Sequence, residues 1–268
     1  MPRVLLVDAG SLSLAEAAAI PLFAAPRFPE GYEALVATGR IDGSGVTVGS
    51  LAAVWSSGGV FRRASGGGEY RASGGDYFGV IVFNGGTLKW AYEVAVDEFS
   101  RYSGLVYGVG KSASKPFIEL YSPSSLEAVV EEAFREWDIV EDDEPVPREL
   151  LEPIVSKLSR EEWIDPVRGE GSLVSYRVTR NGSVFGLVGY VSDGLIRGLW
   201  PDSNIHVYPP GLARSLVKET VYSPPSPGLA YSLANSFISL LEYAGVEPED
   251  IFAAAEGFVR RAEEYAQP

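Results

Sequence analysis

The chain has 268 residues, of which 46% are hydrophobic and 12% aromatic, and this is enough to bury a sizeable core. Its formal net charge of −14 argues against a general nucleic-acid-binding protein, because the phosphate backbone would be repelled. Cysteine is absent, which excludes disulfides, thiolate metal ligands and a thioester formed on the protein itself.

No apolar stretch is long enough to cross a membrane, and the start lacks the basic segment and apolar run of a signal peptide. We therefore expect a soluble, cytoplasmic protein. Glutamine occurs only at Gln267 and methionine only at Met1. The scarcity of thermolabile side chains fits a protein from a thermophile.

The chain begins with a predicted strand and helix. Residues 3–7 are apolar and β-branched, which predicts a strand. Ser13 and Glu16 have the spacing of a capping box, so a helix is expected to start there. Proline lacks a backbone N–H, and the helix is therefore expected to stop before Pro21.

The middle of the chain combines short strands with amphipathic helices. Strands are predicted at 35–38, 46–48 and 77–83. Helices are predicted at 88–99, 126–137, 148–158 and 160–163. The acidic run at 141–144 lies beside a proline and is expected to be a solvated loop rather than a metal site.

The second half starts with a predicted hairpin, whose strands at 173–179 and 184–191 flank an Asn181-Gly182 turn. A further strand is expected at 204–208, and it carries the single histidine, His206, in a structural or surface role.

The chain ends in a predicted helical pair over 229–264, with helices at 229–243 and 248–264 that should pack onto the sheet or against a second subunit. The mixture of hairpins and helices predicts an α+β fold, with a mixed, mostly antiparallel sheet flanked by helices. We expect one domain over residues 1–268.

One stretch stands out chemically. Arg62 and Arg63 run into Ser65-Gly66-Gly67-Gly68, and Ser73-Gly74-Gly75-Asp76 follows before an apolar strand. Three successive glycines let the backbone approach a ligand closely, and their N–H groups can form an anion-binding nest. An adjacent arginine adds a planar cation suited to carboxylate or phosphate. The alternative is a glycine-rich hairpin with two solvated arginines.

The segment Arg62-Arg63-x-Ser65-Gly66-Gly67-Gly68 resembles the signature loop of lipoate–protein ligases, in the superfamily that includes biotin ligases and octanoyltransferases. Residues 5–20 resemble that family's opening strand, turn and helix, and residues 45–50 resemble the strand before the loop. The resemblance covers about the first ninety residues. Relative to the family, residues 141–170 look like an insertion. The octanoyltransferase branch uses an acceptor cysteine and is excluded here.

The resemblance implies that a lipoate- or biotin-like acid is activated with ATP and Mg²⁺ as an acyl-adenylate, and is then passed to a lysine of a lipoyl or biotinyl carrier domain. No resident metal site is expected. The implied ligand-binding residues are Arg62, Arg63, Ser65, Gly66, Gly67, Gly68, Ser73, Gly75, Asp76 and Gly186.

Three features depart from the family pattern, and one of them is that the family's Asn-Asp-Ile triplet is absent from residues 175–178. With the family's hairpin glycine placed on Gly186, its catalytic lysine falls on Ser183, and its His-Asp pair falls on Ala72-Ser73. Serine cannot replace a cation, so Arg180 and Lys111 are the candidate substitutes. The alternative is a catalytically degenerate protein that acts as a ligand-binding or scaffold subunit, with the C-terminal helices as an oligomer interface.

Overall fold

The computed structural model describes residues 1–55, 59–142 and 146–266. The chain forms two compact units, Met1–Val48 with Gly58–Ile164, and Gly49–Ser57 with Asp165–Pro268. Both units combine helices with mixed or antiparallel sheets, which confirms the predicted α+β class. Within the described residues, no helix is long and apolar enough to span a membrane.

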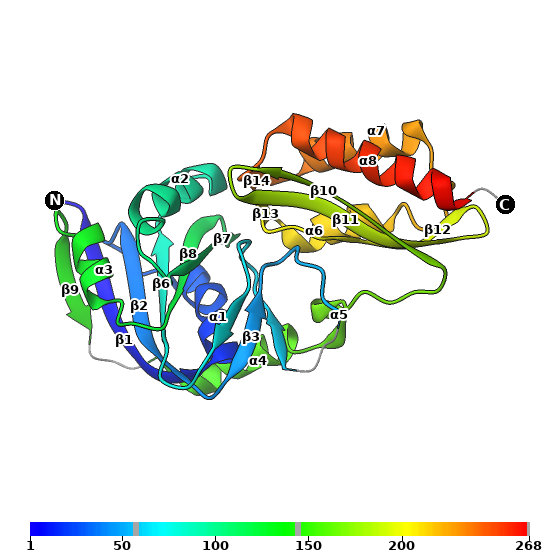
Figure 1. Ribbon diagram of the computed structural model, residues 1–268. Coiled ribbons are helices and arrows are strands. Elements are labelled where there is room, and N and C mark those ends of the chain that lie inside the picture. The colour runs from blue at the N-terminus through cyan, green and yellow to red at the C-terminus, as the bar shows by residue number, and fades with distance from the viewer. Residues whose placement is uncertain (56–58, 143–145, 267–268) are drawn as a thin grey trace. The chain divides into compact units, whose positions relative to one another are not determined.

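The first unit is built on a six-stranded sheet (Figure 1). Its strands, in spatial order, are β7 (Val106–Ser112), β8 (Lys115–Ser122), β6 (Tyr77–Phe83), β2 (Ala34–Asp42), β1 (Arg3–Ser13) and β9 (Asp138–Asp142). Strand β1 runs parallel to β2 and β9, whereas the pairs β2–β6, β6–β8 and β7–β8 are antiparallel. The sheet is therefore mixed and mostly antiparallel, as predicted.

A second, three-stranded sheet carries the glycine-rich segment. It consists of β4 (Val60–Arg62), β3 (Gly45–Val48) and β5 (Tyr70–Ala72). Strand β3 pairs parallel with β4 and antiparallel with β5. We call residues 62–68, which leave β4 and lead toward β5, the glycine loop.

Helices α1 (Leu14–Ala24) and α4 (Arg148–Leu158) pack together and share one core with the sheet. Side chains alternate along β1, so that Val7 and Ala9 point toward the core shared with these helices, whereas Leu6 and Asp8 lie on the opposite face of the sheet. The remaining helical segments of this unit are η1 (Ala25–Arg27), α2 (Leu88–Phe99), α3 (Glu127–Ala133) and α5 (Glu161–Ile164).

The start of α1 is the predicted capping box. The Glu16 backbone N–H donates to Ser13 Oγ at 3.2 Å, and the Ser13 N–H donates to Glu16 Oε2 at 2.7 Å. The predicted stop before Pro21 is wrong, because α1 continues to Ala24. Proline removes one helical hydrogen bond, but the surrounding alanines are buried, and this burial outweighs the loss.

Replacing Ser13 by alanine should lower the free energy of unfolding by about 1 kcal/mol, because the first turn of α1 loses its side-chain acceptor. The matched control is Ser11→Ala, since Ser11 is exposed and its hydroxyl only donates to Asp42 Oδ1. Denaturant titrations of the two variants test this prediction. Equal stabilities of the two variants would contradict a capping role for Ser13.

The second unit contains a three-stranded antiparallel sheet of β10 (Ser172–Arg180), β11 (Ser183–Ser192) and β12 (Leu195–Pro201), with a small pair of β13 (His206–Tyr208) and β14 (Glu242–Ala244). Its helices are α6 (Pro210–Lys218), α7 (Pro227–Leu240) and α8 (Pro248–Ala266). Helix α8 packs on β10 and β11, and α7 packs on α8 (Figure 1). This agrees with the expectation that the C-terminal helices cover a sheet.

The segment Gly49–Ser57 belongs to the second unit, although it precedes the glycine loop in sequence. The backbone N–H groups of Ser203 and Val167 donate to the carbonyls of Leu51 and Val54, at 3.0 and 2.6 Å. Leu51 is fully buried in this unit's core. His206 is buried on β13, which fits a structural role.

Several predicted boundaries need correction. The helix expected to reach Trp137 ends at Ala133, because Phe134 leaves the helical conformation with φ −111° and ψ 15°. The strand Asp138–Asp142 that follows was not predicted, and neither were β4, β5, β7, β8, β12, β14 and α6. Glu141 and Asp142 of the acidic run predicted as a loop belong to strand β9, and the rest of the run, residues 143–144, lies outside the described residues. The single domain and the inserted segment at 141–170 stay predictions.

Candidate functional site

The glycine loop is folded into the first unit rather than spread over its surface. Residues 62–67 are all buried. Its backbone is anchored at both ends, since the Arg63 N–H donates to the Val48 carbonyl at 3.0 Å and the Gly66 N–H donates to the Val109 carbonyl at 2.9 Å. The predicted solvated hairpin is therefore not what forms here.

Gly67 is the position where the loop needs glycine. Its φ is +94°, and a Cβ atom there would lie 2.4 Å from the Tyr107 carbonyl oxygen. A side chain would thus need both a left-handed backbone and a shift of β7. In contrast, a Cβ at Gly68 would meet no atom within 4 Å. The close approach of backbone to backbone that the sequence predicts is real at Gly67, and here its neighbour is strand β7.

Arg63 is completely buried beneath the loop. Its Nη2 donates to the carbonyls of Gly66 and Gly68, at 3.2 and 2.7 Å, so the guanidinium ties two points of the loop together. The same group lies over the Tyr121 ring, with the guanidinium carbon 5.2 Å from the ring centroid. A buried cation needs such compensation, because its desolvation is costly.

Glu119 supplies an acidic group near Arg63. It lies on β8, is fully buried, and its Oε1 accepts a hydrogen bond from the Tyr121 hydroxyl at 3.2 Å. Burial raises the pKa of Glu119 above its ordinary value, and the nearby Arg63 and Ser65 oppose this rise. Burial and the neighbouring Glu119 likewise raise the pKa of Tyr121. The result is a buried cluster of Arg63, Ser65, Glu119 and Tyr121, which we call the buried polar cluster.

The raised pKa of Glu119 predicts a pH-dependent stability. The folded protein holds this proton more tightly than the unfolded chain, so the contribution is present below the ordinary value of 4.5 and is lost as pH rises through the folded-state pKa. Glu119→Gln removes this titration, and the variant should gain stability relative to the wild type as pH rises above 4.5. Denaturant titrations at several pH values measure the difference. A difference independent of pH would contradict the prediction.

Several atoms of the buried polar cluster lack hydrogen-bond partners. In the part of the chain that the structure describes, none is found for Nε and Nη1 of Arg63, Oγ of Ser65 or Oε2 of Glu119. The Ser65 hydroxyl influences the Glu119 carboxyl, but its geometry does not complete a hydrogen bond. Each unsatisfied buried polar group costs about 1 to 3 kcal/mol. Oxygen atoms of a ligand, or ordered water, would remove that cost.

Arg62 is buried in a different direction. Its Nε donates to the Ile164 carbonyl at 2.9 Å, while the Trp163 indole N–H donates to the Arg62 carbonyl at 2.7 Å. Arg62 thereby joins β4 to α5. Its predicted role in holding a ligand stays a prediction, because its side chain is engaged with the protein.

The second small-residue turn holds itself together through Asp76. Its Oδ2 accepts hydrogen bonds from the Tyr70 hydroxyl at 2.8 Å and from the Ser73 N–H at 2.9 Å. Burial and this carboxylate raise the pKa of Tyr70. Gly75 is exposed and has φ +95°, as a tight turn requires. The contacts of Ser73, Gly75 and Asp76 are those of a braced turn, and their predicted role in ligand binding stays a prediction.

The remaining predicted residues divide between the units. Ser183, Gly186 and Arg180 lie on the β10–β11 hairpin of the second unit, whereas the glycine loop and Lys111 lie in the first. Arg180 pairs with Asp250 at 2.7 Å. A Cβ at Gly186 would lie 2.7 Å from the Tyr176 carbonyl oxygen, so the neighbouring strand explains this glycine. The placement of the family lysine at Ser183 stays a prediction.

The first unit has its own hairpin with cations, which the sequence analysis considered only in part. Lys111 lies on β7, two residues after the carbonyl that accepts the Gly66 N–H. Lys115 starts β8, and its Nζ donates to Asn84 Oδ1 at 3.2 Å. The connecting residues Ala113 and Ser114 have φ 46° and 64°, a conformation that costs energy in residues other than glycine.

Glu119, Tyr121 and Lys115 were missed by the sequence analysis. The available signal was weak, because one glutamate in the apolar run Phe117-Ile118-Glu119-Leu120 has no local partner. Among the described residues, no group of three or more histidine or acidic side chains is placed to hold a metal ion.

No protein-family model matches the sequence, and the comparison with curated proteins gives no match. Among solved structures, LipL1 of P. falciparum, determined in complex with lipoate, has a TM-score of 0.61 and 10% identity, covering 96% of this chain and 99% of that one. The protein Ta0514 of T. acidophilum with bound lipoic acid (TM-score 0.44, 14% identity, 60% of this chain and 98% of that one) is too distant to support an argument. The same holds for lipoate-protein ligase A bound with ATP (0.45, 14%, 61% and 98%). The likeness to LipL1 shows that the chain has a divergent lipoate–protein ligase-like fold.

Proposed function

We propose, from its lipoate–protein ligase-like fold, that the chain binds a lipoate- or biotin-like acid, or its acyl-adenylate, at the glycine loop. The observation that carries this proposal is the set of unpartnered atoms in the buried polar cluster. Arg63 keeps two guanidinium nitrogens without a hydrogen-bond acceptor among the described residues, and Ser65 keeps its hydroxyl. These donors suit the oxygens of a carboxylate or an acyl phosphate.

The protonation state of Glu119 determines whether an anionic group can bind beside it. An ionised carboxylate would repel a second anion, whereas a protonated carboxyl can donate a hydrogen bond to it. Because burial raises the pKa of Glu119, the protonated form is favoured more than in an exposed glutamate. A bound anion would raise this pKa further. The cluster can thus act as a donor set around one ligand oxygen.

Transfer of the acid to a carrier lysine needs ATP with Mg²⁺ to form the mixed anhydride, and a cation to stabilise its developing charge. The candidate cations are Lys111 and Lys115 on the first unit's own hairpin, and Arg180 on the hairpin of the second unit. Each of these three residues is replaced by alanine in a separate variant. If the chain is an active ligase, the variant that lacks the stabilising cation should lose about two decades in the rate of ATP–pyrophosphate exchange. The other two variants should exchange at the wild-type rate.

A second candidate function is a catalytically degenerate protein that binds the ligand or serves as a scaffold subunit. Two observations favour it. Where the resemblance places the family's lysine and its His-Asp pair, this chain has Ser183 and Ala72-Ser73. In addition, Nη2 of Arg63 is already bonded to the loop's own carbonyls.

One experiment separates the two functions. The full chain is mixed with ATP, Mg²⁺ and lipoate, octanoate or biotin, and pyrophosphate exchange is followed together with the mass of an added lipoyl or biotinyl carrier domain. Exchange and an acyl mass increment on the carrier establish a ligase. Binding of an adenylate analogue without exchange establishes the degenerate protein. If the chain shows no exchange and binds no adenylate analogue, the proposed ligand site is overturned.

A further inference from the structure

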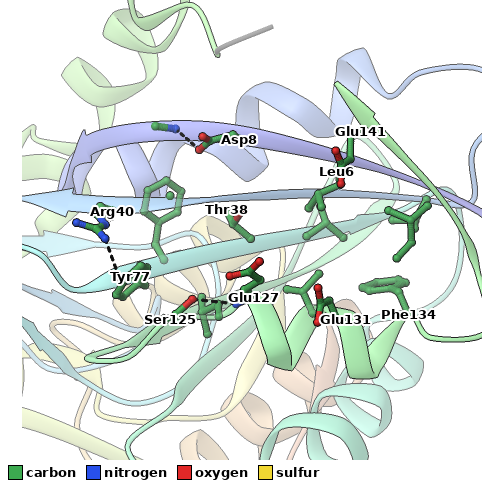
Figure 2. A pocket seen from close by; sticks show the side chains of 18 of the residues that line it. Leu6, Asp8, Thr38, Arg40, Tyr77, Ser125, Glu127, Glu131, Phe134 and Glu141 are labelled. Carbon is green, nitrogen blue, oxygen red and sulfur yellow. Dashed lines mark hydrogen bonds between the residues drawn. The ribbon is translucent and has the colours of Figure 1, made fainter. Parts of the chain in front are cut away.

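A groove of about 610 Å³ lies in the first unit, on the sheet face opposite the core of α1 (Figure 2). It runs between α3 and the strands β9, β1, β2 and β6. The register places Leu6 beside Val36 and Glu141, so these side chains share one face. No residue of the glycine loop or the buried polar cluster lines the groove. The groove is therefore a separate site.

The floor of the groove is apolar. Val4, Leu6 and Val36 line it from the sheet, and Leu126, Val130 and Phe134 line it from the segment containing α3. Its volume lies within the range of about 300 to 1,000 Å³ that small-molecule pockets occupy. The groove thus offers an apolar body of that size a place to bury its surface.

The walls of the groove are strongly acidic. Five carboxylates line it, those of Asp8, Glu127, Glu131, Glu141 and Asp142, against one guanidinium, so five negative charges minus one positive charge leave a net of −4. That guanidinium, Arg40, is already engaged, because its Nη2 donates to the Tyr77 hydroxyl at 3.0 Å and it stacks on the same ring.

Two of these carboxylates repel each other because they lie close together on the same helix. Glu127 and Glu131 are one helical turn apart, and like charges at that spacing destabilise a helix. Figure 2 shows Glu127 directed from α3 toward Thr38, with Glu131 one turn farther along. Within the described part of the chain, Glu127, Glu131 and Glu141 form no ion pair. A cation in the groove would offset their repulsion.

We propose that this groove binds a small organic cation, with its amine or guanidine group among Glu127, Glu131 and Glu141 and its apolar body on the floor of Val4, Leu6 and Val36. The apolar floor and the acidic walls occur in one cavity, and an inorganic cation would leave the floor unused. This site does not depend on the proposed ligase-like function, since it lies on the other face of the sheet.

The test is calorimetric titration of the full chain with phenethylamine, 1,6-diaminohexane and agmatine, with uncharged 2-phenylethanol as the matched neutral probe. At least one cation should bind in one copy per chain, and binding should weaken as salt rises. Phenethylamine should bind at least about tenfold more tightly than the alcohol, because its ammonium group is attracted by several exposed carboxylates at once and the neutral hydroxyl is not. Failure of all three cations to bind, or equal affinity for phenethylamine and the alcohol, would overturn the proposal.

Variants locate the binding. The double variant Glu127→Gln, Glu131→Gln should lose at least about tenfold in affinity for the cation. Its matched control is Glu93→Gln with Asp97→Asn, two exposed carboxylates one turn apart on α2 that do not line the groove. Thr38→Phe, which fills the groove and keeps every carboxylate, should also prevent binding. Unchanged binding in the first variant or in Thr38→Phe would contradict the site.

Discussion

Replacing Arg63 by alanine is expected to lower the free energy of unfolding by about 3 to 5 kcal/mol, because the fully buried Glu119 would lose the nearby positive charge that opposes the rise in its pKa. The two hydrogen bonds to Gly66 and Gly68 would be lost as well. Urea titrations of the wild type and the variant measure this difference. If Arg63→Ala does not fold at all, the same cause accounts for this result. A double replacement of Arg63 and Glu119 then tests that cause.

The double variant Arg63→Met, Glu119→Leu removes both buried ionisable groups and should recover most of the lost stability. The matched single control is Arg71→Ala in the same segment. Arg71 also faces a carboxylate, with 2.7 Å from its Nε to Glu69 Oε1, but its side chain is 81% exposed. We expect this control to change stability by less than about 1 kcal/mol. Equal losses for Arg63→Ala and Arg71→Ala would contradict a stabilising role for the buried Arg63 guanidinium.

Replacing Gly67 by alanine should have the second large effect. The φ of +94° strains any side chain, and the added Cβ would lie 2.4 Å from the Tyr107 carbonyl oxygen. We expect a loss of about 3 kcal/mol in the free energy of unfolding, because the strain and the displaced strand both contribute. If the loop holds the ligand, an adenylate analogue should also bind at least about tenfold more weakly, since the donors move.

Gly68→Ala is the control for this prediction. It adds the same methyl group one residue later, where no atom lies within 4 Å. The equilibrium constant for its unfolding and its dissociation constant for the analogue should both stay within a factor of about three of the wild-type values. The two variants are compared by calorimetry at a temperature at which both are folded. If Gly68→Ala is as damaging as Gly67→Ala, the close approach to β7 is not what restricts the loop.

Local sequence signals predicted the elements whose cause is local. The capping box of Ser13 and Glu16 forms as expected, helix α2 has the predicted bounds 88–99, and Asn181-Gly182 makes the predicted tight turn with φ 48° and 82°. Such signals reside in a few adjacent residues, and tertiary contacts did not override them. This explains why the α+β class could be predicted.

Elements that depend on distant partners were harder to predict. Strand β9 pairs with β1 in parallel, although more than a hundred residues separate them, and its acidic composition favoured a loop. Helix α3 ends at Ala133, although the apolar spacing continues to Trp137, because Phe134 leaves the helical conformation. A pattern of apolar spacing does not show at which residue a helix ends.

The sequence predicted some residues of the candidate site, but it did not predict how they are arranged or which partners surround them. The sequence indicated that Arg63 and the glycines act together, and they do form one buried unit. It could not indicate Glu119 or Tyr121, because nothing near them in sequence asks for a polar partner. The folding of β8 against the loop brings these side chains to Arg63.

The most direct test of the account is hydrogen exchange of the full chain with and without a non-hydrolysable lipoyl-adenylate analogue. If the glycine loop receives the acyl or phosphoryl group, the amides of residues 63–68 should exchange more slowly on saturation with the analogue, together with those of β7 next to it. Saturable binding that leaves these amides unchanged, or no binding by the folded chain, would contradict the assignment of the ligand site to this loop.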